Sequence, residues 1–215
     1  MVKPTIDRAF DDWKEREALA EAMIPLIGKL YRRNVVLYMH GVPLFNESVI
    51  EIMRIHRRVR QIEKNELSEF ETHPMIAVLA ELDLAPAHVD IGKLASAFMT
   101  DPEGQALEDY VKAACADLLS AESVVSHPPR DVVIYGFGRI GRLVMRLLVE
   151  KAGGGQNLVP RAVVLRPPKD PVKDLHKRAS LMRRDSIHGP FRGTIRVDAE
   201  HQAIICNGNA IRFIY

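Results

Sequence analysis

The apolar residues of the first part of the chain recur mostly at helical spacing. Over residues 6–33 this spacing predicts one long helix, which Pro25 should kink or divide because proline lacks an amide hydrogen and clashes with the preceding turn. Residues 34–38 could be either the last turn of this helix or a short strand. Asn46 is expected to cap a second helix. Further helices are expected to begin at Pro74, near Val89 and near Asp101. The first 119 residues therefore predict a small helical bundle.

The pattern changes after residues 120–130, a segment rich in serine and proline that is typical of a linker. Val132–Tyr135 are β-branched or aromatic and predict a short buried strand, and apolar residues from Leu143 to Leu148 continue at helical spacing. A second strand is expected at residues 161–165. Residues 194–215 alternate and turn at Asn207-Gly208, as in a hairpin that leads into a third strand. Strands that alternate with helices indicate a parallel α/β sheet.

The fold class that follows is α+α/β, with an N-terminal helical bundle before an incomplete Rossmann-type, doubly wound domain. We expect the helical domain at residues 1–119, the linker at 120–130 and the partial dinucleotide-binding domain at 131–215. Such sheets have the strand order 3-2-1-4-5-6. We do not expect the strands that would pair on the other side of the first strand in these residues, so the first strand should lie at an edge. An exposed edge favours aggregation unless it is covered, and the helical domain, another copy of the chain or a separate piece could cover it.

Three glycines between the first strand and its helix form the pattern G-x-G-x-x-G. The first glycine permits a tight turn, the second lets the backbone approach a pyrophosphate, and the third lets the helix pack closely against the strand. Free amides at the start of the helix attract phosphates. The alternative is a glycine-rich turn that binds nothing. We expect a cofactor site that consists of Gly136, Phe137, Gly138, Arg139, Ile140 and Gly141.

Three ordered segments resemble glyceraldehyde-3-phosphate dehydrogenase. They are GFGRIGR at residues 136–142, RRDSIHGPFRGTI at 183–195 and NGNAI at 207–211. The resemblance covers residues 131–215, the start of that family's cofactor domain, and the helical region resembles the N-terminal extension of some long bacterial members. It implies an NAD(P)-dependent oxidoreductase of glycolysis or gluconeogenesis in the cytoplasm.

The residue at the position that binds the adenosine ribose differs from the family's pattern. The family has Asn-Asp-Pro after the second strand, where this chain has Leu165-Arg166-Pro167. Arg166 cannot accept hydrogen bonds from the ribose hydroxyls, but its guanidinium would attract a 2′-phosphate. We therefore include Arg166 among the cofactor-binding residues and expect NADP to be favoured slightly over NAD. The alternative is that Arg166 faces solvent in a site that binds nothing.

Catalytic chemistry is not expected from these 215 residues. The resemblance implies a thiohemiacetal on a cysteine in a Ser-Cys-Thr-Thr-Asn-Cys segment, together with a histidine base, and neither segment is found here. Cys206 lies in a predicted hairpin strand, and the resemblance makes His188 structural. We expect a truncated or split product of the dehydrogenase that is inactive alone. The alternative is a non-catalytic nucleotide-binding interaction or regulatory protein whose helical domain binds a protein partner.

Composition and charge narrow the classes of partner. With 47% hydrophobic and 27% charged residues, the chain should fold. Residues 130–215 carry 16 Lys+Arg and 7 Asp+Glu, whereas residues 1–129 carry 14 and 21. The basic half suits a polyanion such as a dinucleotide, and nucleic acid is the least favoured partner. No apolar run approaches bilayer length, and the N-terminus does not resemble a signal peptide. The histidines and cysteines lack metal-ligand spacing. Another copy of the chain is a further candidate partner, which would make a homo-oligomer.

Overall fold

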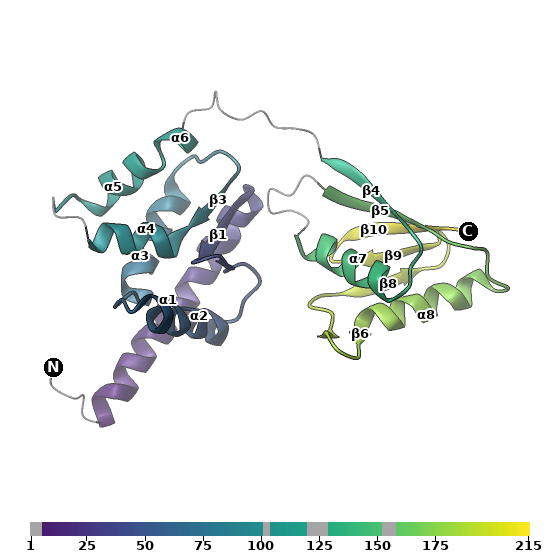
Figure 1. Cartoon of the computed structure of the whole chain (residues 1–215), viewed down its shortest axis with the longest axis horizontal. Coiled ribbons are helices and arrows are strands. Elements are labelled where there is room, and N and C mark those ends of the chain that lie inside the picture. The colour runs from purple at the N-terminus through teal and green to yellow at the C-terminus, as the bar shows by residue number, and fades with distance from the viewer. Residues whose placement is uncertain (1–5, 101–103, 120–128, 152–157) are drawn as a thin grey trace. The chain divides into compact units, whose positions relative to one another are not determined.

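The computed structural model describes residues 6–100, 104–119, 129–151 and 158–215, and the chain divides into two compact units (Figure 1). The first unit contains the described residues up to Leu119, and the second contains those from Pro129 onward. The linker predicted at 120–130 lies outside the described residues except for its last two. The predicted helical N-terminal region and Rossmann-type sheet are both confirmed.

The first unit combines helices with a small sheet. Its sheet has the order β2-β1-β3, and β1 pairs with β3 in parallel. The elements are α1 (Ile6–Arg32), β1 (Val35–Met39), β2 (Val42–Pro43), α2 (Val49–Glu63), α3 (Glu69–Glu81), β3 (Ala87–Asp90), α4 (Ile91–Met99), α5 (Leu107–Ala114) and α6 (Ala116–Leu119).

The structure decides between the two alternatives that the sequence left open for residues 34–38, and it adds two strands to the predicted helices. Residues 34–38 overlap a strand because Val35, Val36 and Leu37 are all buried, which suits a strand covered on both faces. The helix expected near Val89 begins only at Ile91, after Asp90 has capped it by accepting the Lys93 amide.

Two predicted helix starts were wrong, and Pro25 does not divide α1, which continues as one helix from Ile6 to Arg32. The cap of α2 is Ser48, whose side chain accepts the Glu51 amide, and not Asn46. α3 contains Pro74 in its interior, because a capping box of Ser68 and Glu71 starts the helix earlier.

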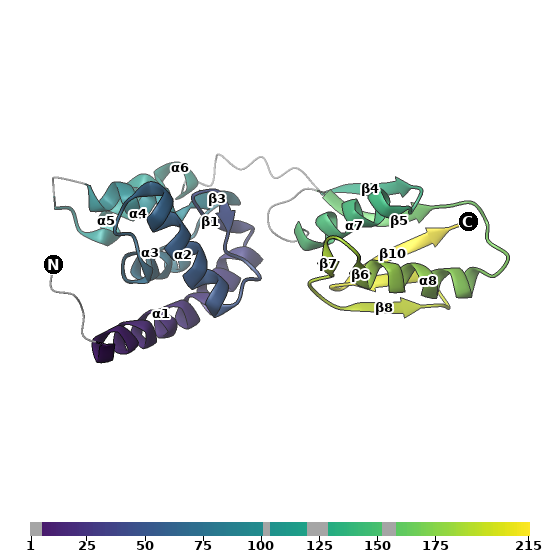
Figure 2. The same ribbon diagram turned by 60° about the horizontal axis from the view of Figure 1, so that its bottom comes forward.

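Helix α1 has two different halves. From Ala20 onward it buries Met23, Ile27 and Leu30 against the core that α2, α3 and β1 share. Its N-terminal half projects past these elements (Figures 1 and 2), and residues 8–15 are exposed. Phe10 and Trp13 follow the helical apolar pattern but are 64% and 44% exposed. The pattern could not show that the side chains of Phe10 and Trp13 stay exposed.

A buried polar cluster links α1, α2 and α3. His56 is fully buried, and its Nδ1 donates to the Ile52 carbonyl at 2.8 Å while its Nε2 lies 2.8 Å from Thr72 Oγ1. Glu69 is 1% exposed, lies 3.7 Å from His56 and accepts Arg16 at 3.0 Å. Burial lowers the pKa of His56, although the neighbouring Glu69 opposes that shift.

The second unit is a five-stranded mixed sheet with the order β4-β5-β10-β9-β8. β4, β5 and β10 are parallel, and β10, β9 and β8 form the antiparallel hairpin extension. The elements are β4 (Arg130–Tyr135), α7 (Arg139–Lys151), β5 (Leu158–Val164), α8 (Pro171–Arg183), β6 (Arg184–Asp185), β7 (Gly189–Pro190), β8 (Ile195–Asp198), β9 (Ala203–Cys206) and β10 (Asn209–Ile214).

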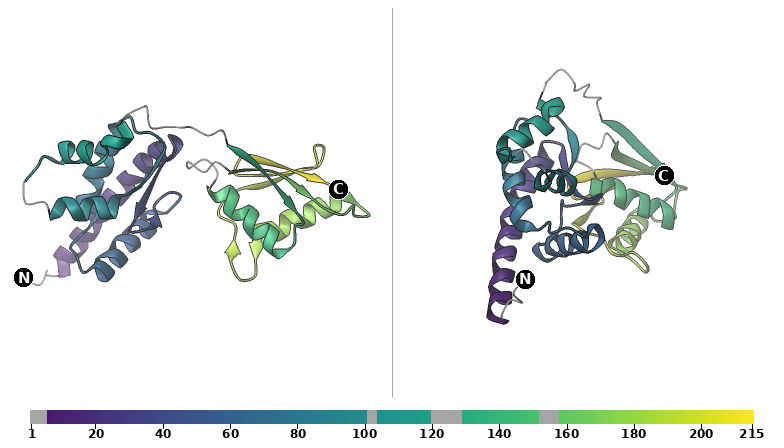
Figure 3. Two further views of the ribbon diagram at one scale, coloured as in Figure 1. Left: turned by 45° about the horizontal axis from the view of Figure 1, so that its top comes forward. Right: turned by 60° about the vertical axis from the view of Figure 1, so that its left-hand side comes forward.

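Both helices of the second unit, α7 and α8, cover the same face of this sheet (Figure 3, left). Val163, Ile211 and Phe213 are buried on that face. On the other face Val133 and Tyr135 of β4 are 57% and 88% exposed. The prediction of a buried first strand was therefore wrong: β4 lies at the edge of the sheet, and only its Ile134 side packs against the core.

Candidate functional site

The loop between β4 and α7 is held by the sheet on one side and by the core on the other. Gly136 has φ +89°, in the left-handed region, and its amide donates to the Val164 carbonyl at 2.9 Å, which extends the β4–β5 pairing by one residue. The next side chain, Phe137, is 3% exposed and meets the Phe213 ring edge-on with 5.2 Å between centroids. These two contacts anchor the first two residues of the loop.

The other two glycines of the motif differ in what surrounds them. A Cβ on Gly141 would lie 2.6 Å from the Gly136 carbonyl oxygen, so a side chain there would collide with the backbone of the loop. A Cβ on Gly138 would meet no heavy atom within 4 Å. The fold itself demands glycine at position 141 but not at 138, where the open space lies beside the helix start.

Helix α7 directs unpaired amides into that open space. Its first hydrogen bond runs from the Arg142 amide to the Gly138 carbonyl at 3.1 Å. By helix geometry the amides of Arg139, Ile140 and Gly141 have no acceptor inside the helix. Together with the macrodipole they create a partial positive charge of about half a unit at this end. The arrangement suits an anion.

Arginines connect α7 to the segment at residues 183–195. Arg139 Nη2 lies 3.4 Å from Asp185 Oδ1 and 3.2 Å from Ser186 Oγ. Arg146 is 6% exposed, donates through both terminal nitrogens to the Gly189 carbonyl at 3.2 Å, and stacks over the Phe191 ring. Sequence reasoning treated the two motifs separately and missed these contacts. The available signal was Arg146, which lies at a core-facing position of the predicted helix and therefore needs a buried acceptor.

Asp185 organises the small hairpin of β6 and β7. Its Oδ1 accepts the amides of His188 and Ile187 at 3.0 Å each and contacts His188 Nδ1 at 3.1 Å. These bonds, with that to Arg139, hold the pKa of Asp185 well below its usual range. The His188 side chain is 55% exposed and its ring contacts its own hairpin, so a structural role for it stays a prediction.

Arg166 lies at the same edge of the sheet as the glycine loop. Tyr135 pairs with Val164 in parallel, so Gly136 and Arg166 both follow the carboxyl ends of neighbouring strands. Arg166 is exposed and makes no ion pair with the residues that the structure describes. Among the described residues no hydrogen bond or ion pair joins it to residues 136–141, so the structure does not tie Arg166 to the glycine loop.

The sheet, the glycine loop and both helices of the second unit lie within residues 130–215. That segment matches the glyceraldehyde 3-phosphate dehydrogenase, NAD binding domain. The match covers the dehydrogenase-type domain as the structure delimits it and includes every residue of the expected cofactor site. It supports NAD-type cofactor binding at the fold level and assigns no individual residue.

Relatives of this dehydrogenase type fall into two groups by coverage. A glyceraldehyde-3-phosphate dehydrogenase-like protein of Pseudomonas aeruginosa (strain UCBPP-PA14) is 50% identical over 196 residues, which is 90% of this chain and 42% of the relative. Glyceraldehyde-3-phosphate dehydrogenase of Monascus purpureus is 38% identical over 82 residues, 38% of the chain and 21% of that protein. Glyceraldehyde-3-phosphate dehydrogenase 2 of Drosophila melanogaster is 42% identical over 78 residues, which is 36% of this chain and 20% of that protein. The chain thus spans less than half the length of these relatives, and the Pseudomonas similarity includes most of the helical unit.

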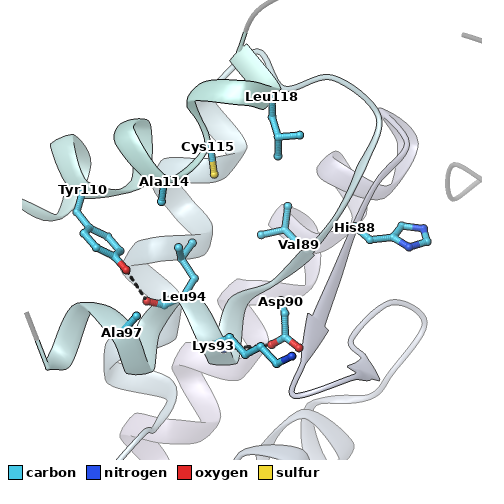
Figure 4. A pocket seen from close by; sticks show the side chains of 10 residues that line it. All are labelled: His88, Val89, Asp90, Lys93, Leu94, Ala97, Tyr110, Ala114, Cys115 and Leu118. Atoms are coloured by element: carbon cyan, nitrogen blue, oxygen red, sulfur yellow. Dashed lines mark hydrogen bonds between the residues drawn. The ribbon is translucent and has the colours of Figure 1, made fainter. Parts of the chain in front are cut away.

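The first unit carries a separate hollow of about 390 Å³ between β3, α4, α5 and α6 (Figure 4). Its polar groups are largely engaged: Asp90 accepts the amides of His40, Gly41 and Lys93, and the Tyr110 hydroxyl donates to the Leu94 carbonyl. The rest of the lining is mostly apolar. Its hydrogen-bonded groups serve the fold, and the hollow shows no catalytic arrangement.

The described residues contain neither an exposed cysteine nor a cluster of metal ligands. Cys206 is fully buried with its Sγ 3.8 Å from Met182 Sδ, and burial raises its pKa to about 12. Burial also raises the pKa of Cys115. Among the described residues no group of three or more His, Cys, Asp or Glu is placed to hold a metal ion. None of the helices in those ranges is both long and apolar enough to span a bilayer.

Proposed function

We propose that residues 130–215 bind a nicotinamide dinucleotide with its pyrophosphate at the loop of Gly136–Gly141. The observation that carries the proposal is the contrast between the two glycines: position 141 is closed by backbone, whereas position 138 faces open space next to three free amides. A pyrophosphate needs such an approach to the backbone, and the match to an NAD binding domain supports the same ligand.

We further propose that this domain serves a glyceraldehyde-3-phosphate dehydrogenase-like enzyme of glycolysis or gluconeogenesis in the cytoplasm. The names and identities of the relatives support the reaction class. The 215 residues tested alone should bind cofactor without oxidising glyceraldehyde 3-phosphate, because a catalytic thiolate is required and both cysteines are buried with raised pKa values. The alternative, a nucleotide-binding interaction protein, draws support from the separately folded helical unit.

NADP is the cofactor that Arg166 favours. An exposed guanidinium at the end of β5 can pair with a 2′-phosphate and cannot accept hydrogen bonds from ribose hydroxyls.

Calorimetric titration of the 215-residue chain with NADP⁺ and with NAD⁺ tests both points. We expect measurable binding of both and tighter binding of NADP⁺, and Arg166→Asp should reverse the order. Exposed Arg161 in the same unit, changed to Asp, is the matched control for charge reversal. Equal or tighter NAD⁺ binding by the unchanged chain would refute the preference. Failure of both dinucleotides to bind at millimolar concentration would refute the function itself.

A further inference from the structure

A chain of polar contacts ends on the carbonyl group of Phe137, inside the glycine loop. Arg178 of α8 donates from Nη1 to the Phe137 oxygen at 3.3 Å, and its Nε pairs with Asp174 Oδ2 one turn earlier on the same helix. The Tyr215 hydroxyl, just beyond β10, donates to the same Asp174 oxygen at 3.2 Å. These contacts thus link three segments that are distant in sequence, and only Arg178 touches the peptide group itself.

The peptide that Arg178 holds is the one that joins Phe137 to Gly138. No cis peptide bond occurs in the described residues, so the carbonyl and the amide of this peptide point in opposite directions. A carbonyl drawn toward Arg178 therefore turns the Gly138 N–H away from α8. Among the described residues no acceptor takes that N–H, and the position of Gly138 is open.

We propose that Arg178 is a positioning residue of the dinucleotide site, which orients the Gly138 amide toward the pyrophosphate. The inference rests on the proposed function of the loop. Asp174 and Tyr215 fix the guanidinium in turn. Burial raises the pKa of Tyr215 to about 12, so its hydroxyl keeps its proton at neutral pH and remains a donor to the Asp174 carboxylate.

If Arg178 served only the stability of the fold, its loss would lower stability and would not act on the Phe137–Gly138 peptide. Arg178 and Asp174 are partly exposed, with 23% and 17% of their side chains accessible, and form an i,i+4 pair on one helix. Pairs of this kind add little to stability. Loss of Arg178 should therefore leave unfolding nearly unchanged while it frees the Phe137–Gly138 peptide to rotate. Because both dinucleotides contain the pyrophosphate, their binding should weaken together.

The test uses the ¹⁵N-labelled 215-residue chain and the variants Arg178→Met, Arg178→Lys and Tyr215→Phe. Without ligand, Arg178→Met should shift and broaden the resonance of the Gly138 amide, because the Phe137–Gly138 peptide is then free to rotate. With ligand, binding of NADP⁺ and NAD⁺ should weaken by a similar factor, about ten-fold, as for loss of one hydrogen bond to a charged group. Arg178→Lys should recover part of the affinity, and Tyr215→Phe should give a smaller effect in the same direction.

Arg161→Met is the matched control, because Arg161 pairs with Asp131 on the same unit but does not contact the loop. An unchanged Gly138 amide and unchanged affinities in both Arg178→Met and Tyr215→Phe would overturn the inference. If Arg178→Met does not fold, Tyr215→Phe decides by the same two measurements. If the unchanged chain binds neither dinucleotide, the proposed function fails, while the amide measurement on the free chain still reports separately whether Arg178 sets the peptide.

Discussion

Gly138 and Gly141 make a matched pair of substitution sites. They lie three residues apart, and a new side chain would collide with backbone only at Gly141. In Gly141→Ala the new Cβ would lie 2.6 Å from the Gly136 carbonyl oxygen, which is 0.8 Å inside the 3.4 Å at which ordinary contact begins. The opposing atom is backbone, so the loop or the helix must move. In Gly138→Ala the Cβ meets nothing within 4 Å, and φ lies outside the left-handed region.

The two substitutions should therefore affect different properties. Overpacking against backbone costs about 2–3 kcal/mol, and alanine returns at most about 1 kcal/mol of helix propensity, so Gly141→Ala should destabilise the second unit by about 1–2 kcal/mol. Gly138→Ala should change stability by less than about 0.5 kcal/mol. Its methyl group would occupy the approach of the pyrophosphate and should weaken dinucleotide binding by about ten-fold or more, or ~1.4 kcal/mol.

Hydrogen exchange at the amides of β5 and β10 measures the stability of this unit within the whole chain, since these strands form the centre of its sheet. Calorimetry with NADP⁺ gives the affinity. We expect exchange in β5 and β10 to accelerate in Gly141→Ala alone, and affinity to fall in Gly138→Ala without faster exchange. Full affinity in Gly138→Ala would refute the assignment of the open space to a ligand. Unchanged exchange in Gly141→Ala would refute the packing explanation.

Two further predictions concern buried titratable groups. The lowered pKa of His56 means that the unfolded chain binds a proton below pH about 6.5 before the folded chain does, so the first unit should lose stability as pH falls through this range. Urea unfolding followed by the amide resonances of α2 should show this slope, and His56→Gln should flatten it. The exposed His88→Gln is the control, and a pH-independent midpoint in the unchanged chain would contradict the prediction. Cys206 should resist iodoacetamide at neutral pH until urea unfolds the second unit, and rapid alkylation of the native chain would exclude the buried thiol described above.

Local signals in the sequence were sufficient for much of the second unit. The three glycines, the strand before them and the helix after them depend on neighbours within about one turn, and the structure has each of them. The same holds for the turn at Asn207-Gly208, where both residues have positive φ. Resemblance to a known family added the order of the elements.

Contacts between distant segments could not be read from the sequence in the same way. β1 is a strand because it pairs with β3, and Val36 meets His88 across a long intervening stretch. Arg139, Arg146 and Arg178 each bond to an acceptor on another element, and the spacing of residues along the chain does not show such acceptors. The exposure of Tyr135 likewise depends on which face of the sheet the helices cover, and periodicity does not encode that choice.

The central place of β10 also bears on how the second unit is assembled during synthesis. β10 is translated after its neighbours β5 and β9, yet it joins them. Until residues 209–214 leave the ribosome, the other strands of this sheet can form only two separate pairs, β4–β5 and β8–β9, with open edges, a state that chaperones recognise. Phe213 must then arrive before Phe137 can pack against it, so the glycine loop is among the last parts of the unit to become ordered.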